Sequence, residues 1–189
     1  MERETSITVL IGLVLGLALA RVIAFGARLY RSNEQATRVY WLHLVWVGAL
    51  FLLIVENWWV ICEKWDFNKV NSYWGLSLLL LSPMLLYFLS VLICPNKEDG
   101  GGVRLKDLHE RTRIFFYASL GILFLVYIPE AVFMHKDVQA FSHPMNWMRL
   151  GIASIFFLSA LFVNKRPALD PFLPPIMILL LVASNWLKN

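Results

Sequence analysis

A few ionisable side chains lie inside long apolar segments, and they are the first candidates for chemistry in this sequence. Glu56 lies in the apolar run 52–59, Glu130 follows Pro129, and Arg149 lies near the start of a later apolar run. A charged group is costly to bury in a bilayer, so an ionisable residue within a membrane span indicates function by default. Two carboxylates and a guanidinium at a similar depth could line a pathway for cations or protons.

A purely structural alternative exists for the same three residues. Arg149 could neutralise Glu56 or Glu130 and thereby fix the order of the helices, because buried charges are usually paired whatever their role. The sequence leaves both interpretations open.

His43 and Asn57 add polar groups to the helix that carries Glu56. They are fourteen residues apart, and at about 100° per residue they lie within about 40° of each other around the helix. The face between them is apolar and includes Trp46 and Leu50. This face could line a pore, or it could form an interhelical seam with a hydrogen bond at each end.

Other chemistries lack the residues they need. Cys62 and Cys94 are predicted at opposite faces of the membrane, so they cannot form a disulfide within one chain, and neither has a zinc-ligand spacing. His43 is the single histidine inside a predicted span, which argues against a haem held by two histidines. We therefore expect no metal, no cofactor and no catalytic residue. An intramembrane lipid-modifying enzyme with Glu56 as its base is the weakest of the functional alternatives.

The composition explains why these residues must be read in a membrane context. Of 189 residues, 59% are hydrophobic and 16% are charged, and the mean hydropathy is +0.63. Soluble domains have about 45–50% apolar and about 25% charged residues, and a small domain cannot hide so much apolar surface. The composition excludes a soluble enzyme, a disordered chain and a nucleic-acid binder, despite the formal net charge of +4.

The elements that would position the polar residues are membrane-spanning helices. About 20 apolar residues cross a bilayer, and the sequence predicts six such spans in a single domain of residues 1–189, with five as the fallback number. Residues 95–113 are predicted as a cytoplasmic loop followed by a helix extension. The six predicted spans are 7–27, 40–62, 71–94, 114–134, 147–163 and 172–187.

The first span could also be taken for a signal peptide, since Ala18-Leu19-Ala20 has the form of a cleavage site. The residues before it lack the expected positive charge, so we predict a permanent helix. Small side chains recur every four residues along this helix and predict close helix packing. The packing is expected within the chain, with a subunit interface as the alternative. The stripe consists of Thr8, Gly12, Gly16, Ala20 and Ala24.

The distribution of Lys and Arg predicts the orientation of the spans. The loops after the first, third and fifth spans hold ten of these residues, against six on the opposite side. Cytoplasmic loops carry the excess of positive charge, so both termini are predicted outside. The general layout resembles that of small bacterial inner-membrane proteins, without a specific family motif.

Together these patterns predict an all-α, polytopic membrane bundle with short loops. Almost the whole chain is membrane-embedded, so the leading hypothesis is a small, oligomeric channel or transporter for ions or small solutes. Its lipid environment and a second copy of the chain would be its partners, with no nucleic acid. The runner-up is a non-catalytic membrane subunit or scaffold that docks a partner protein. The expected pathway residues are His43, Glu56, Asn57, Glu130 and Arg149.

Overall fold

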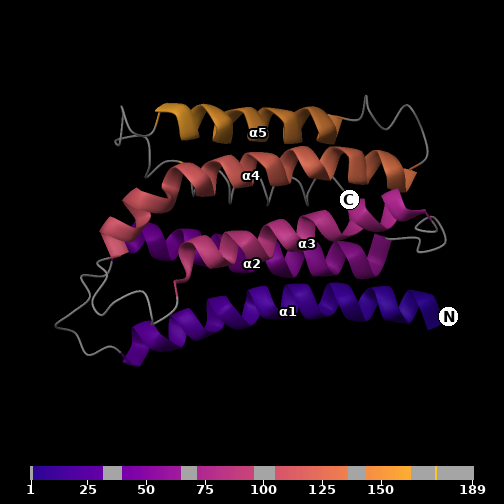
Figure 1. Ribbon diagram of the computed structural model, residues 1–189. Coiled ribbons are helices and arrows are strands. Elements are labelled where there is room, and N and C mark those ends of the chain that lie inside the picture. Colours follow the sequence, from indigo (N-terminus) through magenta and orange to yellow (C-terminus); the bar gives the residue numbers. More distant parts are fainter. Residues whose placement is uncertain are drawn as a thin grey trace.

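The computed structural model of the chain describes residues 2–31, 40–64, 72–95, 105–135, 144–162 and 173. Its elements are all helices, and Figure 1 shows them lying side by side with their axes roughly parallel. Successive helices run in opposite directions, as short connections require. The helices are α1 (Glu2–Arg31), α2 (Trp41–Lys64), α3 (Tyr73–Ile93), α4 (Leu105–His135) and α5 (Pro144–Phe162).

The centre of the bundle is formed by α3 and α4. Helix α3 packs against α1, α2 and α4, and α5 packs mainly on α4. In Figure 1 the order from bottom to top is therefore α1, then α2 and α3, then α4, then α5. Any polar group buried where α2, α3 and α4 meet is shielded on several sides.

Four helices are long and apolar enough to cross a membrane, and α5 contains a shorter apolar segment, Asn146–Phe162. The all-helical membrane class is thus as predicted, but the count of six spans is not confirmed. The sixth predicted span, 172–187, lies outside the described residues except for Leu173, which is helical and buried. The four long apolar segments are Thr5–Tyr30, Trp41–Cys62, Tyr73–Ile93 and Leu105–Glu130.

The ends of α3 follow from local sequence chemistry. Ser72 is the N-cap, and its hydroxyl accepts a hydrogen bond from the Gly75 backbone N–H at 3.0 Å. Such a cap satisfies one of the free donors of the first turn and stabilises a helix by about 0.5–2 kcal/mol. At the other end the helix stops at Ile93, two residues before Pro95. A proline disfavours the helical conformation of the residue before it, which here is Cys94.

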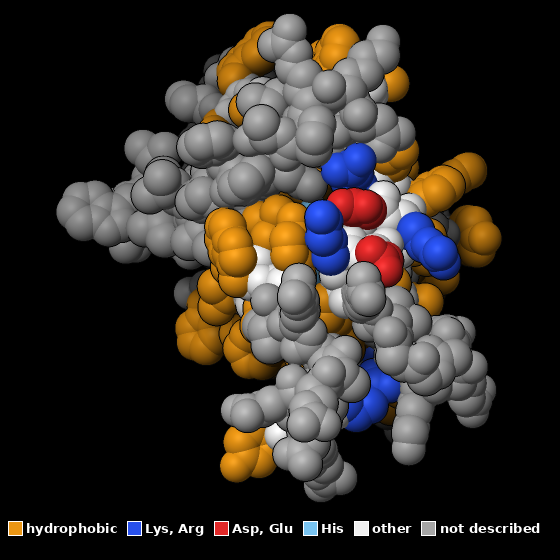
Figure 2. Space-filling view, turned by 90° about the vertical axis from the view of Figure 1, so that its left-hand side faces the viewer, with side chains coloured by type: hydrophobic (Ala, Val, Ile, Leu, Met, Phe, Trp, Pro, Cys, Tyr) orange, Lys and Arg blue, Asp and Glu red, His pale blue; other side chains and the backbone are white. Residues whose placement is uncertain are grey.

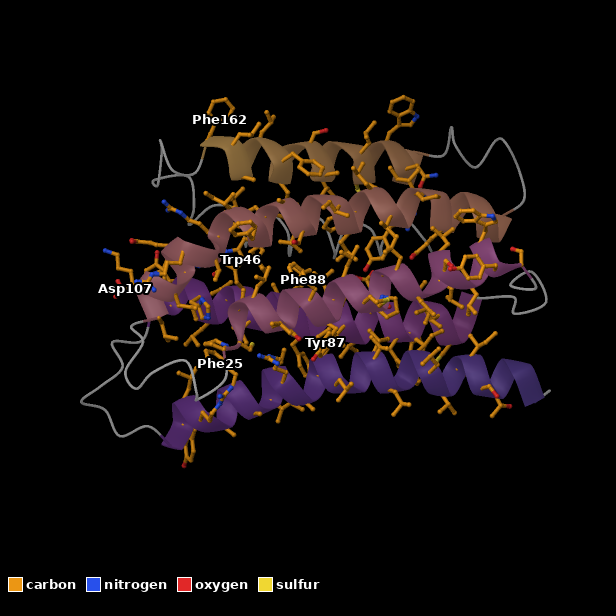
Figure 3. All side chains as sticks on the ribbon, viewed as in Figure 1. Phe25, Trp46, Tyr87, Phe88, Asp107 and Phe162 are labelled. Carbon is orange, nitrogen blue, oxygen red and sulfur yellow. The ribbon has the colours of Figure 1, made fainter. Side chains whose placement is uncertain are left out.

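An aromatic cluster joins α2, α4 and α5 in the core. The Trp46 ring lies 5.1 Å from that of Phe116 and 5.5 Å from that of Tyr117, measured between centroids. Phe156 of α5 stacks on Phe124 at 5.9 Å. Trp46 is labelled in Figure 3, where it lies between α4 and the helices below it. Aromatic pairs of this kind contribute about 0.5–1.5 kcal/mol beyond the burial of their area.

Helix α1 packs on the bundle mainly through large side chains. Large aliphatic and aromatic side chains form the buried face, while Gly16, Ala20 and Ala24 are exposed and Thr8 and Gly12 are half-buried. At 3.6 residues per turn, Gly16 and Ala20 lie on the side of the helix opposite the buried face. Within the chain, the stripe meets another helix at Gly12, where an added Cβ would lie 3.2 Å from the Trp58 ring of α2, whereas an added Cβ at Gly16 would meet no atom within 4 Å. The buried residues are Ile7, Ile11, Leu15, Ala18, Val22 and Phe25.

Candidate functional site

Polar side chains gather in two buried layers of the bundle. One, here called the carboxylate layer, lies toward the end where α2 finishes and α3 begins. The other, the histidine layer, lies toward the end where α3 finishes and α4 begins, and it comprises Arg21, His43, Cys94 and His109. The carboxylate layer takes side chains from α2, α3, α4 and α5: Glu56, Asn57, Ser82, Tyr127, Glu130, Asn146 and Arg149.

Asn57 is the hub of the carboxylate layer. Its side-chain N–H₂ donates to the Ser82 hydroxyl at 3.2 Å and to the Tyr127 hydroxyl at 3.4 Å. The side chain is only 5% exposed, so both bonds are shielded from water. Asn57 thereby connects α2 to both α3 and α4.

Glu130 places a carboxyl group beside the same hydroxyl. The Ser82 hydroxyl accepts from Asn57 and is also hydrogen bonded to the Glu130 carboxyl group, which uses both its acceptor and its donor capacity. Glu130 is 6% exposed, and its second oxygen, Oε1, has no hydrogen-bond partner in the part of the chain that the structure describes; the same holds for Asn57 Oδ1. Leaving a buried acceptor unsatisfied costs about 1–3 kcal/mol. Two such acceptors around one serine hydroxyl therefore lower the stability of the fold.

Arg149 holds α5 to this layer. One terminal nitrogen, Nη1, donates to the Tyr127 backbone carbonyl at 3.0 Å and to Asn146 Oδ1 at 3.1 Å. The guanidinium carbon lies 5.9 Å from the centre of the Tyr127 ring, within range of a cation–π interaction. The guanidinium also interacts electrostatically with Glu130 and Glu56. Arg149 thus brings positive charge to the layer while its Nη1 donates to neutral oxygens.

Prolines interrupt the helical hydrogen bonds next to the layer. Pro83 follows Ser82 inside α3, and Pro129 precedes Glu130 inside α4. A proline lacks the N–H that would bond the carbonyl of the residue four positions earlier, which here removes the helical donor of Leu79 and of Leu125. The carbonyl groups of Leu79 and Leu125 therefore add hydrogen-bond acceptors to a region that is already rich in them.

The histidine layer has a different chemistry. His43 Nε2 lies 2.8 Å from the Ile93 carbonyl oxygen, and Arg21 Nε donates to the Cys94 carbonyl at 3.0 Å. The last carbonyls of a helix have no partner within the helix, and cationic or N–H groups satisfy them well. The His43 ring packs against that of His109 at 6.0 Å. These side chains therefore complete the end of α3.

The bond to Ile93 also defines the state of His43. A carbonyl oxygen can only accept, so Nε2 carries a hydrogen, and we assign Nδ1 as the bare nitrogen of a neutral ring because a second buried N–H without an acceptor would be costly. Nδ1 is buried without a partner. Phe25 of α1 covers the ring edge-on at 5.7 Å, and Figure 3 shows Phe25 toward the same end of the bundle as Asp107 at the start of α4.

The structure brings four of the five predicted pathway residues together, since Glu56, Asn57, Glu130 and Arg149 share the carboxylate layer. His43 lies in the other layer. The face of α2 between His43 and Asn57 is packed with fully buried apolar side chains, so within the described part of the bundle it forms a seam. These side chains are Trp46, Leu50, Leu53 and Ile54.

Sequence reasoning missed three members of the carboxylate layer. Tyr127 lies three residues before Glu130, on the same helical face, and Asn146 lies three residues before Arg149. This spacing makes neighbours on a helix and could have pointed to both. Ser82 gave only the weaker signal of preceding a proline.

Comparisons with known proteins add nothing to this geometry. No family model, curated protein or solved structure matches the chain. Among the residues that the structure describes, no three His, Cys, Asp or Glu side chains are grouped as metal ligands. The functional argument therefore depends on the two layers alone.

Proposed function

We propose that the chain is a small integral membrane channel or transporter for ions or small solutes, and that the carboxylate layer is the polar site on its pathway. The observation that carries the proposal is the pair of buried, unpartnered acceptors, Glu130 Oε1 and Asn57 Oδ1. Unsatisfied polar groups inside an apolar bundle are expensive. A solute that donates hydrogen bonds to these two oxygens would offset that cost, and the oxygens would then form its binding site.

The other members of the layer take supporting roles in this proposal. Glu56 is half-buried, so it forms the side of the site nearest to solvent or lipid headgroups. Arg149 and Tyr127 join α5 to α4 and set the charge next to Glu130. His43 acts at a distance, because its bond to Ile93 holds α2 and α3 together at the opposite end.

The proposed orientation places the carboxylate layer toward the outside of an inner membrane, with both termini outside. The end of the bundle where α4 begins would face the cytoplasm. Figure 2 looks onto this end and shows basic and acidic side chains side by side. Lys106, Asp107, Glu110 and Arg111 are exposed there in the first two turns of α4, which supports the assignment under the positive-inside rule.

A flux assay tests the proposal. The protein is reconstituted in liposomes, and the uptake of monovalent ions and small polar solutes is compared with that of empty liposomes. Glu130→Gln keeps the size of the side chain but removes its charge, and we expect it to lower flux at least tenfold. Glu110→Gln is the matched control, because Glu110 is exposed and its ion pair with Lys106, at 3.8 Å, lies on the surface. The absence of flux through the wild-type protein would refute the proposal.

A second candidate function is a non-catalytic subunit or scaffold, and the exposed side of α1 favours it. Gly16 and Ala20 are exposed, and a side chain added at Gly16 would meet no atom of its own chain within 4 Å. Close backbone approach along small residues is a common basis for helix association in lipid. Such a face suits a partner helix, from a second copy of the chain or from another membrane protein.

Larger side chains on this face of α1 test the proposed scaffold role. Gly16→Leu and Ala20→Leu fit the isolated chain, so a loss of oligomer or of a co-purifying protein would reflect a blocked interface. Leu17→Phe enlarges an exposed side chain on a neighbouring face and should leave the assembly intact. An assembly unchanged by all three variants would count against this role for α1.

A further inference from the structure

We propose that Arg21 and Arg28 bind the phosphate group of one anionic phospholipid, whose acyl chain lies along the exposed side of α1. The site lies at the end of the bundle where α1 and α3 finish, away from the carboxylate layer. Phe25, which lies between the two arginines in the sequence, marks this end of α1 in Figure 3. The proposal goes beyond the transport function, because it assigns a specific lipid ligand to a different part of the molecule.

The two arginines lie on one side of α1, at the depth where a lipid phosphate meets the bundle. They are seven residues apart, which is about 10 Å along a helix and about 20° around it. Both guanidinium groups interact electrostatically with the Cys94 side chain at the end of α3, and Arg21 Nε donates to the Cys94 carbonyl at 3.0 Å. The apolar segment of α3 ends at Ile93. Arg21 is therefore level with the end of a membrane span, and Arg28 lies about two turns beyond it.

Both arginines keep donors for an anion. Arg28 Nε donates to the Ala24 carbonyl of its own helix at 3.2 Å, just as Arg21 uses its Nε for the end of α3. Within the described part of the chain, neither side chain forms an ion pair, and the terminal Nη groups have no hydrogen-bond acceptor. Both side chains are half-buried, so the Nη groups can be reached from the lipid side. A guanidinium fork matches the geometry of phosphate oxygens.

The charge balance favours an anionic lipid over a zwitterionic one. The two guanidinium groups each carry one positive charge, and the C-terminal end of α3 offsets only about half of one charge. The pair therefore remains positive and attracts a phosphodiester, which carries one negative charge. A choline headgroup would bring its own cation next to the guanidinium groups and lose most of this attraction. Basic groups at the ends of membrane helices bind anionic lipid headgroups in the same way.

Apolar side chains on the same side of α1 indicate that the phosphate belongs to a lipid. Leu10 and Leu17 are 43% and 59% exposed, and both lie within about 40° of Arg21 around the helix. They precede Arg21 in the sequence, so they lie toward the middle of the membrane span. An acyl chain attached to the bound phosphate would run along them and bury their surface. A free phosphate ion would gain nothing from this contact.

Native mass spectrometry of the purified full-length protein in a neutral detergent provides the test. Phosphatidylglycerol and phosphatidylcholine with the same acyl chains are titrated, and we expect the first to bind at least tenfold more tightly. Arg28→Gln should weaken the binding of phosphatidylglycerol about fivefold, which corresponds to about 1 kcal/mol for one basic side chain. Arg28→Lys should retain most of the affinity. Arg111→Gln is the matched control, because it removes an exposed basic side chain from α4, and it should bind like the wild type.

Arg28→Gln keeps the test decisive if Arg21→Gln fails to fold. The hydrogen bond of Arg28 stays within α1, whereas that of Arg21 joins two helices. Equal binding of the two lipids, or an unchanged affinity in Arg28→Gln, would overturn the inference. Displacement of the lipid by an equal concentration of inorganic phosphate would overturn the assignment to a lipid. The measurement is binding and not flux, so its failure is distinct from a failure of the proposed transport function.

Discussion

The two polar layers use their polar groups in opposite ways. In the histidine layer, Arg21 and His43 reach across to backbone carbonyls at the end of α3. In the carboxylate layer, side chains from within α2, α3 and α4 bond mainly to one another and leave two acceptor oxygens unpaired among the described residues, and the first two turns of α5 add Asn146 and Arg149. A helix end needs polar partners in order to be buried, whereas the middle of a helix does not. Buried polar side chains near the end of a helix therefore have a structural explanation. Buried polar side chains within a helix need a different explanation.

The histidine layer also contains an unpaired nitrogen, Nδ1 of His43. It belongs to a neutral ring, so its burial costs less than that of an oxygen of an ionisable carboxyl group. The distinction between the layers is therefore one of charge as well as of hydrogen bonding.

The largest loss of stability is expected for His43→Ala. The change removes a fully buried ring and leaves the Ile93 carbonyl without a partner, and each effect is destabilising. We expect the free energy of unfolding to fall by about 3 kcal/mol, measured by denaturant or thermal titration. A change of less than about 1 kcal/mol would show that the histidine layer is not mainly structural.

Glu130→Gln should behave in the opposite manner. Removing the charge relieves its desolvation, and Arg149 keeps Glu56 as an electrostatic partner, so the stability should stay within about 1 kcal/mol of the wild type. Flux in liposomes should nevertheless fall at least tenfold. The two measurements are made on the same preparation. A large loss of stability in this variant would show that the carboxylate layer, like the histidine layer, mainly stabilises the fold.

A smaller contrast is expected between two serines of α3. Ser82 is hydrogen bonded to both Asn57 and Glu130 across helices, whereas Ser90 donates to the Tyr87 carbonyl within its own helix at 2.6 Å. Ser82→Ala should cost about 1–2 kcal/mol and Ser90→Ala about 0.5 kcal/mol. Equal losses of stability would mean that the interhelical hydrogen bonds of Ser82 contribute no more to stability than the bond of Ser90 within its own helix.

Thiol labelling probes the two ends of the bundle without disturbing either layer. Cys62, near the end of α2, is exposed, and Cys94, at the end of α3, is buried. A membrane-impermeant maleimide added outside intact cells should label Cys62, and Cys94 should react only after unfolding. Cys62→Ser provides the control, since it should abolish labelling of the native protein. Labelling of Cys62 only in opened cells would reverse the proposed orientation.

The sequence was sufficient to predict the elements that depend on composition. The four long apolar helices follow from the length and hydropathy of their segments, and the gathering of Glu56, Glu130 and Arg149 was anticipated because isolated charges in lipid are costly. The partners of Arg149 were harder to predict. The guanidinium donates to a backbone carbonyl and an asparagine, and the sequence does not reveal where a backbone carbonyl will lie.

The packing of α1 shows a second limit of sequence reasoning. The spacing of Gly12, Gly16 and Ala20 predicts that a helix can approach closely, but it does not say which helix. In the bundle, Ile11 and Leu15 are buried and Gly12 lies against Trp58 of α2, while Gly16 and Ala20 are exposed. The choice depends on the shapes of α2 and α3, which are set by residues far away in the chain.

The two bonds at the end of α3 have a mechanical consequence. Arg21 and His43 attach the last carbonyls of α3 to α1 and α2 by short bonds to the backbone, whereas Ser82 is held only by side chains. If α3 rotated about this anchored end at Ile93, the rest of the helix would move as a rigid rod. Ser82 lies eleven residues along that rod, about 16 Å from the anchored end. A rotation of about 10° would shift it sideways by about 3 Å, a distance that separates a closed hydrogen bond from a broken one.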